Sequence, residues 1–230
     1  SASALDACGA DYRLLDPREA LARGVTLPPG WSALYQPEAG IVYADRARAA
    51  FLELARRRGA QVETGRRVDS LDDVAADVVV VTAGAWVTKL VPDIPVRVTR
   101  ETIAYFRREG PPMPSVVELS EATRGHAMYA LYDPLYGLKA GAHHTGPEAD
   151  PDEDGRPSGR TVATIAAWVL RTLPVDPQPV EADTCIYTST ADESFVLERR
   201  GRIVIGSPCS GHGFKFAPAV GRRLAALALE

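Results

Sequence analysis

The sequence predicts a mixed α/β protein in which a block of antiparallel strands interrupts an α/β domain. Two continuous runs of β-branched residues, at 78–81 and 203–205, are typical of strands covered on both faces. Segments with apolar residues at helical spacing, at 45–58 and 217–229, accompany these runs. Between them, roughly residues 92–190 consist mainly of short strand-like segments, which predicts the antiparallel block.

Composition and charge exclude several classes of function. The 230 residues are 46% hydrophobic and 24% charged, as in globular proteins, and carry a net charge of −4. No basic surplus points to nucleic acid, and no apolar run approaches the length that spans a membrane. The three cysteines are widely spaced and odd in number, which argues against a disulfide framework and a structural zinc site. We therefore expect a protein of a reducing compartment, the cytoplasm, without a metal site.

The first ninety residues predict two helices with N-terminal caps. Asp16 is placed to cap a short helix over 16–23, with Pro17 at its first position. Asp45 is placed to cap a longer helix over 45–58. The apolar face of this longer helix consists of Ala47, Ala50, Phe51 and Leu54. The other predicted elements are an extended segment at 33–43 and strands at 61–64 and 77–82.

The middle of the chain alternates short apolar segments with turn-forming residues, which indicates antiparallel strands. The predicted strands are 95–108, 116–119, 127–132, 136–143, 183–188 and 195–197. One helix is predicted over 165–173, where Pro174 ends it. The final strand, at 203–205, then returns to the α/β part of the chain.

A glycine-rich segment, residues 206–216, joins the last strand to the last helix and is called the glycine loop below. Gly206, Gly211 and Gly213 allow a ligand to approach the main chain closely. The N-terminus of the following helix favours negative charge, and Lys215 adds a positive charge there. No Gly-Lys-Ser/Thr follows, so the loop is not a phosphate-binding P-loop. By itself the pattern also fits an ordinary strand-to-helix turn.

The residues of this loop, together with four other motifs, resemble the monomeric sarcosine oxidase family of D-amino-acid-oxidase-like flavoproteins. The string Ser-Gly-His-Gly-Phe-Lys-Phe at 210–216 is similar to the family's C-terminal flavin loop. The family also includes N-methyltryptophan and pipecolate oxidases. The other matching segments are 39–43, 78–86, 137–143 and 185–195, in the family's order.

The resemblance implies a partial FAD-binding (Rossmann-like) domain interrupted by an antiparallel-sheet substrate domain. We expect residues 1–91 and 184–230 to belong to the FAD-binding domain, and residues 92–183 to bind substrate. Family members open with a strand–GxGxxG–helix unit, which this sequence lacks, so it resembles a truncated family member. Such a chain exposes a central sheet edge. We therefore expect it to bind a missing N-terminal segment or to self-associate through that edge.

The resemblance implies catalytic roles for two basic residues. Lys139 matches the family lysine that lies over the flavin and helps oxygen react. A buried cation stabilises superoxide as it forms, although an isolated lysine in a strand usually faces solvent. Lys215 matches the partner of the substrate carboxylate. As a point charge it lacks the fork geometry of an arginine.

Two further pocket residues are implied, each with an alternative. His143 resembles the family's active-site histidine, and the adjacent His144 must point to the opposite face of the same strand. A structural role for His143 is nearly as plausible from the sequence. Tyr129 matches a pocket tyrosine when a gap is placed nearby, and Tyr132 is its rival.

The remaining implied residues would hold FAD. Cys185 lies in a segment similar to the one whose cysteine bonds covalently to the flavin ring, although an isolated strand cysteine is normally a small buried apolar residue. Val68 resembles a valine whose backbone contacts adenine. The other expected cofactor-binding residues are Gly84, Gly211, His212, Gly213, Phe214 and Lys215.

Three functional hypotheses follow from the sequence. The first is an FAD-dependent oxidoreductase that oxidises the C–N bond of a secondary or N-methyl amino acid, with dioxygen as acceptor. The second is a flavin-free, catalytically inactive fragment or interaction domain of the same fold. The third keeps the fold and the amine chemistry but uses another electron acceptor.

Overall fold

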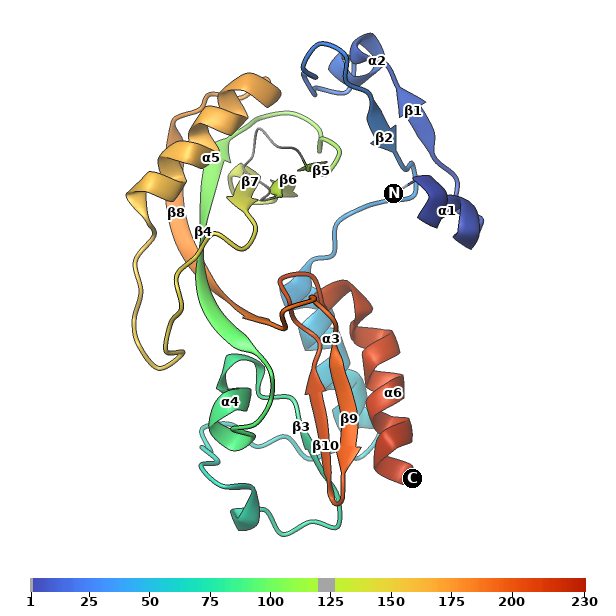
Figure 1. The fold of residues 1–230 in the computed structure, drawn as a ribbon, viewed down its shortest axis with the longest axis vertical. Helices are drawn as coiled ribbons and strands as arrows, with labels where there is room; N and C mark the ends of the chain where they lie inside the picture. Colours follow the sequence, from blue (N-terminus) through green and yellow to red (C-terminus); the bar gives the residue numbers. More distant parts are fainter. Residues whose placement is uncertain (1, 120–126) are drawn as a thin grey trace. The chain divides into compact units, whose positions relative to one another are not determined.

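The computed structural model describes residues 2–119 and 127–230 and divides them into two compact units (Figure 1). The division falls within two long strands, between Arg100 and Glu101 and between Cys185 and Ile186. The first unit comprises residues 1–41, 101–146 and 155–185. The second unit comprises residues 42–100, 147–154 and 186–230.

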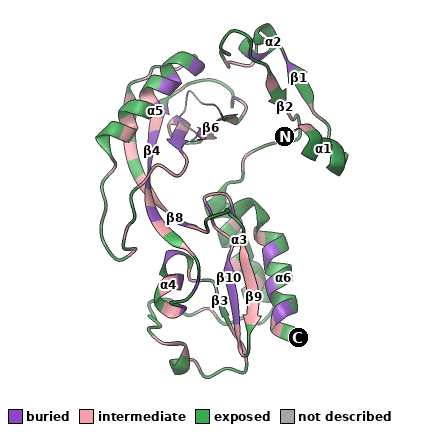
Figure 2. Ribbon diagram, viewed as in Figure 1, coloured by how far each residue is buried: buried purple, intermediate pink, exposed green. Residues whose placement is uncertain are grey.

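The first unit is built on an antiparallel sheet with the strand order β5-β6-β7-β4-β8. The strands are β4 (Arg97–Arg107), β5 (Val116–Glu118), β6 (Met128–Asp133), β7 (Gly137–Ala142) and β8 (Pro179–Ser189). Helix α5 (Gly159–Thr172) packs on one face, after a cap in which the Ser158 hydroxyl accepts the Thr161 N–H. The fully buried residues of the resulting core include Phe106, Leu138, Ile165 and Val169. Figure 2 shows buried stretches along β4 and α5.

The N-terminal part of the first unit is a small αβαβ segment. Its elements are α1 (Ala2–Cys8), β1 (Arg13–Leu15), α2 (Pro17–Leu21) and β2 (Ala33–Tyr35), with β1 and β2 antiparallel. The predicted cap of the short helix is confirmed: the Asp16 carboxylate accepts the Glu19 N–H, and the Glu19 carboxylate accepts the Asp16 N–H.

The second unit contains the predicted buried strands side by side. Strand β10 (Ile203–Ser207) pairs parallel with β3 (Val79–Val81) and antiparallel with β9 (Val196–Arg200). Helix α6 (Ala217–Leu229) covers one face through Val220 and Leu224, which pack on Val204. Val87, in the short helix α4 (Val87–Leu90), packs with Ile205 in a second cluster. Short 3₁₀ turns occupy Leu71–Asp73, Gly84–Trp86 and Phe214–Phe216.

Two predictions about the first half of the second unit are wrong. Helix α3 spans Ala44–Arg57 with Tyr43 as its N-cap residue, so Asp45 lies inside the first turn rather than at the cap. The positive end of the helix dipole stabilises a carboxylate in the first turn, which explains an aspartate at this position as well as a cap would. Residues 61–64 form no strand, because no other strand pairs with them among the described residues.

The second unit has an open strand edge and an exposed apolar helix face. Strand β3 pairs only with β10 among the described strands, so its other edge has no strand partner. No side chain of α3 is buried, and its apolar face is open: Phe51 is 46% exposed and Leu54 is 48% exposed. No helix in the described part of the chain is both long and apolar enough to cross a membrane.

Candidate active site

The face of the five-stranded sheet that points away from α5 carries the predicted catalytic residues of the first unit. Strand residues alternate between faces, and Ala104, Leu138 and Ala140 lie in the core with α5. Lys139 therefore lies on the opposite face, directly across from Tyr105 of β4 and Leu131 of β6. The cross-strand register thus decides which side chains share a surface with Lys139.

The register distinguishes the two candidate tyrosines. Tyr129 pairs with Gly141 and lies on the Lys139 face, whereas Tyr132 pairs with Leu138 and lies on the α5 face. The Tyr129 ring crosses Gly141 closely: a Cβ at Gly141 would lie 2.6 Å from the tyrosine hydroxyl oxygen. Glycine in this motif therefore leaves room for the tyrosine ring.

His143 lies beside Tyr129, with the ring centroids 4.8 Å apart. Its backbone N–H donates to the carbonyl of Ala127 at 2.8 Å, which fixes its position just beyond β7. His144 does not continue the strand, because its φ of 55° places it in a left-handed turn. The structure therefore brings Tyr129, Lys139 and His143 together on one face.

Lys139 is half-buried, and no carboxylate of the described residues forms an ion pair with it. Tyr105 packs against the ring of Tyr136, with centroids 5.1 Å apart. Burial raises the pKa of Tyr105 above its usual value, and Asp183, Asp133 and Cys185 raise it further. Cys185 lies on β8, the strand next to β4, which carries Tyr105.

The glycine loop lies in the second unit and is held by its own main chain. Ser210, with a φ of 42°, donates its N–H to the Thr188 carbonyl at 2.9 Å. The ring Nδ1 of His212 lies 2.8 Å from the Ser210 carbonyl oxygen, so a proton on Nδ1 completes this hydrogen bond. The Lys215 ammonium donates to the His212 carbonyl at 3.1 Å. Phe214 and Lys215 are exposed.

Gly213→Ala is expected to destabilise the protein by about 3 kcal/mol, because a Cβ at this buried position would lie 1.3 Å from the Pro208 carbonyl oxygen. Gly221→Ala is the matched control: Gly221 is exposed in α6, and no atom lies within 4 Å of the added carbon. There alanine should stabilise the helix by about 0.5–1 kcal/mol. Urea unfolding measures both changes, and equal stability of the two variants would contradict the close approach.

A cavity of about 360 Å³ in the second unit brings Val68 to the end of β3. Val68 and Ala83 give it an apolar lining, Trp86 adds an aromatic ring, and Arg66 and Arg67 add positive charge. Gly84, with a φ of +56°, forms the turn between Ala83 and Trp86. The volume lies in the range of small-molecule sites.

The cations around this cavity are balanced by carboxylates of the chain. Lys89 donates to Asp150 at 2.9 Å and also to Asp152, which accepts the Trp86 indole N–H at 2.6 Å. The hydrogen bonds from Lys89, which has the larger effect, and from Trp86 lower the pKa of Asp152 to about 2. Arg67 binds Asp69 at 2.6 Å. Asp150 and Asp152 therefore hold the wall of the cavity in place as ionised groups at neutral pH.

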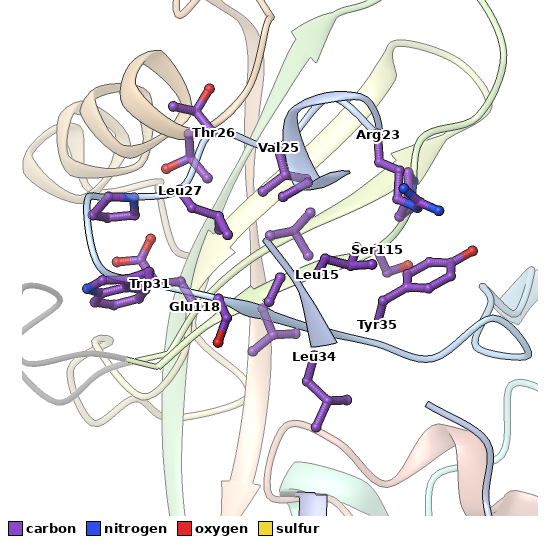
Figure 3. Close-up of a pocket in the computed structure, with 18 of the residues that line it drawn as sticks. Leu15, Arg23, Val25, Thr26, Leu27, Trp31, Leu34, Tyr35, Ser115 and Glu118 are labelled. Carbon is purple, nitrogen blue, oxygen red and sulfur yellow. The ribbon is translucent and has the colours of Figure 1, made fainter. Parts of the chain in front are cut away.

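A second cavity, of about 300 Å³, lies in the first unit between the N-terminal αβαβ segment and β5 (Figure 3). Its wall is mainly aliphatic, with Leu15, Val25 and Leu34, and Arg23 stacks on the Tyr35 ring at 4.9 Å. Glu118 at its edge accepts the Trp168 indole N–H at 2.8 Å. None of the predicted site residues lines this cavity.

Residues 1–227 match the model of the FAD dependent oxidoreductase family, and the chain belongs to this family. The human peroxisomal sarcosine oxidase is 31% identical over 236 residues, covering 90% of this chain. Monomeric sarcosine oxidase from Bacillus sp. (strain B-0618) is 29% identical with the same coverage, and N-methyl-L-tryptophan oxidase from Yersinia pestis is 26% identical over 89% of the chain. The chain spans about 60% of the length of these relatives.

Solved structures share the fold of the whole described chain. The open form of NikD, an amino acid oxidase of nikkomycin biosynthesis, aligns with a TM-score of 0.81 at 23% identity, covering 100% of this chain and 68% of that one. Glycine oxidase from Geobacillus kaustophilus aligns with a TM-score of 0.77 at 22% identity, covering 98% and 65%. The predicted α/β fold with an antiparallel sheet is thus confirmed.

The residues present fit parts of a bound FAD. The cavity at Val68 has the size for a planar base and apolar residues in its lining, and Gly84 lies between the lining residues Ala83 and Trp86. The sequence contains no GxGxxG for the pyrophosphate. Sequence reasoning missed Tyr105 and Arg66, because their contribution depends on cross-strand register and loop folding. The sequence also contained one unused signal. Glu101 is a charged residue inside the apolar strand predicted at 95–108, where charged residues are uncommon.

Proposed function

We propose that the protein oxidises the C–N bond of a secondary or N-methyl amino acid, with FAD as cofactor and dioxygen as acceptor. The observation that carries this proposal is the gathering of Tyr129, Lys139 and His143 on one sheet face, in a chain of this family. The relatives named for sarcosine and N-methyl-L-tryptophan support the substrate class. We assign substrate binding to residues 92–183 and the cofactor to residues 1–91 and 184–230.

Each residue has a distinct proposed role. Bound FAD would accept a hydride equivalent from the substrate carbon and return the electrons to dioxygen. Tyr129 and His143 form a polar and aromatic wall that orients the amine. Lys139 supplies a positive charge where dioxygen becomes negative. Lys215 neutralises the substrate carboxylate, which would be costly to bury alone.

The cofactor would be held by the glycine loop and by two residues outside it. Gly211, His212, Gly213 and Phe214 would present the main chain to the ring, while Val68 and Gly84 would hold the adenine end. We also propose that Cys185 bonds covalently to the flavin. Attachment would replace the thiol S–H and one flavin C–H with an S–C bond. The two electrons and two protons released would reduce dioxygen to hydrogen peroxide.

A visible absorption spectrum of the purified chain with added FAD, followed by a pulse of N-methyl amino acid without oxygen, tests this function. Flavin bands that bleach with substrate and return with air are expected. Bands that bleach but return only with an artificial acceptor would favour the dehydrogenase alternative. An absence of flavin bands at saturating FAD would favour the flavin-free interaction domain.

We further propose that the open edge of β3 and the apolar face of α3 bind another polypeptide, either a second copy or a separate N-terminal segment. The exposed Phe51 and Leu54 and the unpaired strand edge support this. Sedimentation velocity is expected to give a mass above that of one chain, reduced in a Phe51→Glu/Leu54→Glu variant. A wild-type chain that stays monomeric at all concentrations would contradict self-association.

We also propose that the protein is located in the cytoplasm.

A further inference from the structure

Glu101 of β4 is the only charged side chain among the described residues that is buried, with 1% exposure. A carboxylate withdrawn from water is unfavourable unless several hydrogen bonds compensate for the lost hydration. An apolar residue would suit this part of the sheet, because Ile103 two residues along is also buried. The position of Glu101 therefore calls for a specific reason.

The Glu101 carboxylate holds the turn that follows β7. A single oxygen, Oε2, accepts the N–H of Thr145 at 2.9 Å and the N–H of Gly146 at 2.8 Å. The Thr145 hydroxyl donates to the Ala142 carbonyl at 3.3 Å, closing the turn onto the strand. This turn contains the left-handed His144, a conformation that costs energy for a residue other than glycine.

His143 is the last residue before this turn, and its ring packs on Tyr129 at 4.8 Å. Its N–H bond to the Ala127 carbonyl anchors the residue on the β6 side. The turn held by Glu101 anchors it on the other side. Without an acceptor at Oε2, two adjacent N–H groups would lose their partner and the turn would relax.

We propose that Glu101 is a positioning residue that fixes the His143 ring against Tyr129 on the substrate-binding face. The inference rests on the proposed function, in which His143 lines the substrate site. The contacts that carry the inference are those of the Glu101 carboxylate with the Thr145 and Gly146 N–H groups. Its effect on the reaction passes through the orientation of His143.

Asp133 provides a matched control at the opposite end of β7. Its Oδ1 accepts two consecutive N–H groups, those of Leu135 at 2.9 Å and Tyr136 at 2.8 Å. Asp133→Leu and Glu101→Met each remove a carboxylate oxygen that accepts two consecutive N–H groups. The two turns that lose this acceptor lie at the two ends of β7. A purely structural role predicts similar consequences at His143 for both variants.

The test is a nuclear Overhauser cross-peak between the ring protons of His143 and Tyr129 in the isotope-labelled chain. We expect Glu101→Met to lose this cross-peak and to move the His143 ring resonances. Asp133→Leu and Glu101→Gln should keep it, because the glutamine oxygen can still accept both N–H groups. A cross-peak that persists in Glu101→Met, or disappears in Glu101→Gln, would overturn the proposal.

Hydrogen exchange keeps the proposal testable if Glu101→Met does not fold. The Thr145 and Gly146 amides are expected to exchange about tenfold faster in Glu101→Gln than in wild type, since bonds to an ionised acceptor are about twice as strong. Equal exchange rates would overturn the assignment. Neither readout needs flavin, so a wild-type chain without amine oxidase activity would refute the proposed function while leaving these results valid.

Discussion

In the Cys185→Ser variant, acid precipitation is expected to release all of the flavin from the protein, whereas the wild-type protein should retain it. Serine keeps the size of the side chain but provides no thiolate, and the thiolate is the reactive form of cysteine. Cys185 is half-buried in β8, the strand next to β4, where Tyr105 lies opposite Lys139. The measurement is the fraction of visible flavin absorbance that stays with the protein pellet after acid precipitation. It should fall from nearly all to nearly none.

The chain supplies two matched controls for this experiment. Cys8 is exposed in α1, and Cys209 lies in the glycine loop, where its sulfur accepts the Thr188 N–H at 3.4 Å. Cys8→Ser and Cys209→Ser should each leave the flavin in the pellet. Release of flavin by Cys209→Ser, with retention by Cys185→Ser, would transfer the attachment site to the glycine loop. Flavin that is released from the wild-type chain would refute covalent attachment altogether.

The strongest patterns of the sequence predicted the architecture of both units. The valine run before Gly84 and the run Ile203–Ile205 form adjacent parallel strands, as continuous β-branched runs indicate. The predicted strand 61–64 failed because a short apolar segment becomes a strand only if a neighbour pairs with it. Among the described residues, no strand lies beside that segment. Local propensity could not supply this information.

The candidate site shows the same division between local and tertiary information. The choice between Tyr129 and Tyr132 depended on register, because a shift of one residue moves every side chain of a strand to the other face. At the turn after β6, this register places Gly137 against the Arg108 carbonyl with a φ of 99°, a conformation that suits glycine. The motif at 137–143 identified the strand, and folding of the sheet determined its partners.

Lys139→Met is expected to slow reoxidation of the reduced flavin by dioxygen about 10²–10³-fold, while substrate reduction stays nearly unchanged. The estimate follows from removing one preorganised positive group where negative charge develops. Methionine keeps the length and the apolar stem of the side chain. No described carboxylate pairs with the Lys139 ammonium, so no ion pair within the described part of the chain offsets its charge. Lys89 differs, because Asp150 and Asp152 bind it.

Stopped-flow absorbance separates the two half-reactions. Anaerobic mixing with the N-methyl amino acid measures reduction, and mixing the reduced protein with dioxygen measures reoxidation. Lys139→Arg keeps the charge and should retain most of the oxygen reactivity, which distinguishes an electrostatic role from a steric one. Equal slowing of both half-reactions in Lys139→Met would instead indicate a disturbed site. If the methionine variant reoxidises as fast as wild type, positive charge on this face does not assist dioxygen, and the proposed electron acceptor must be reconsidered.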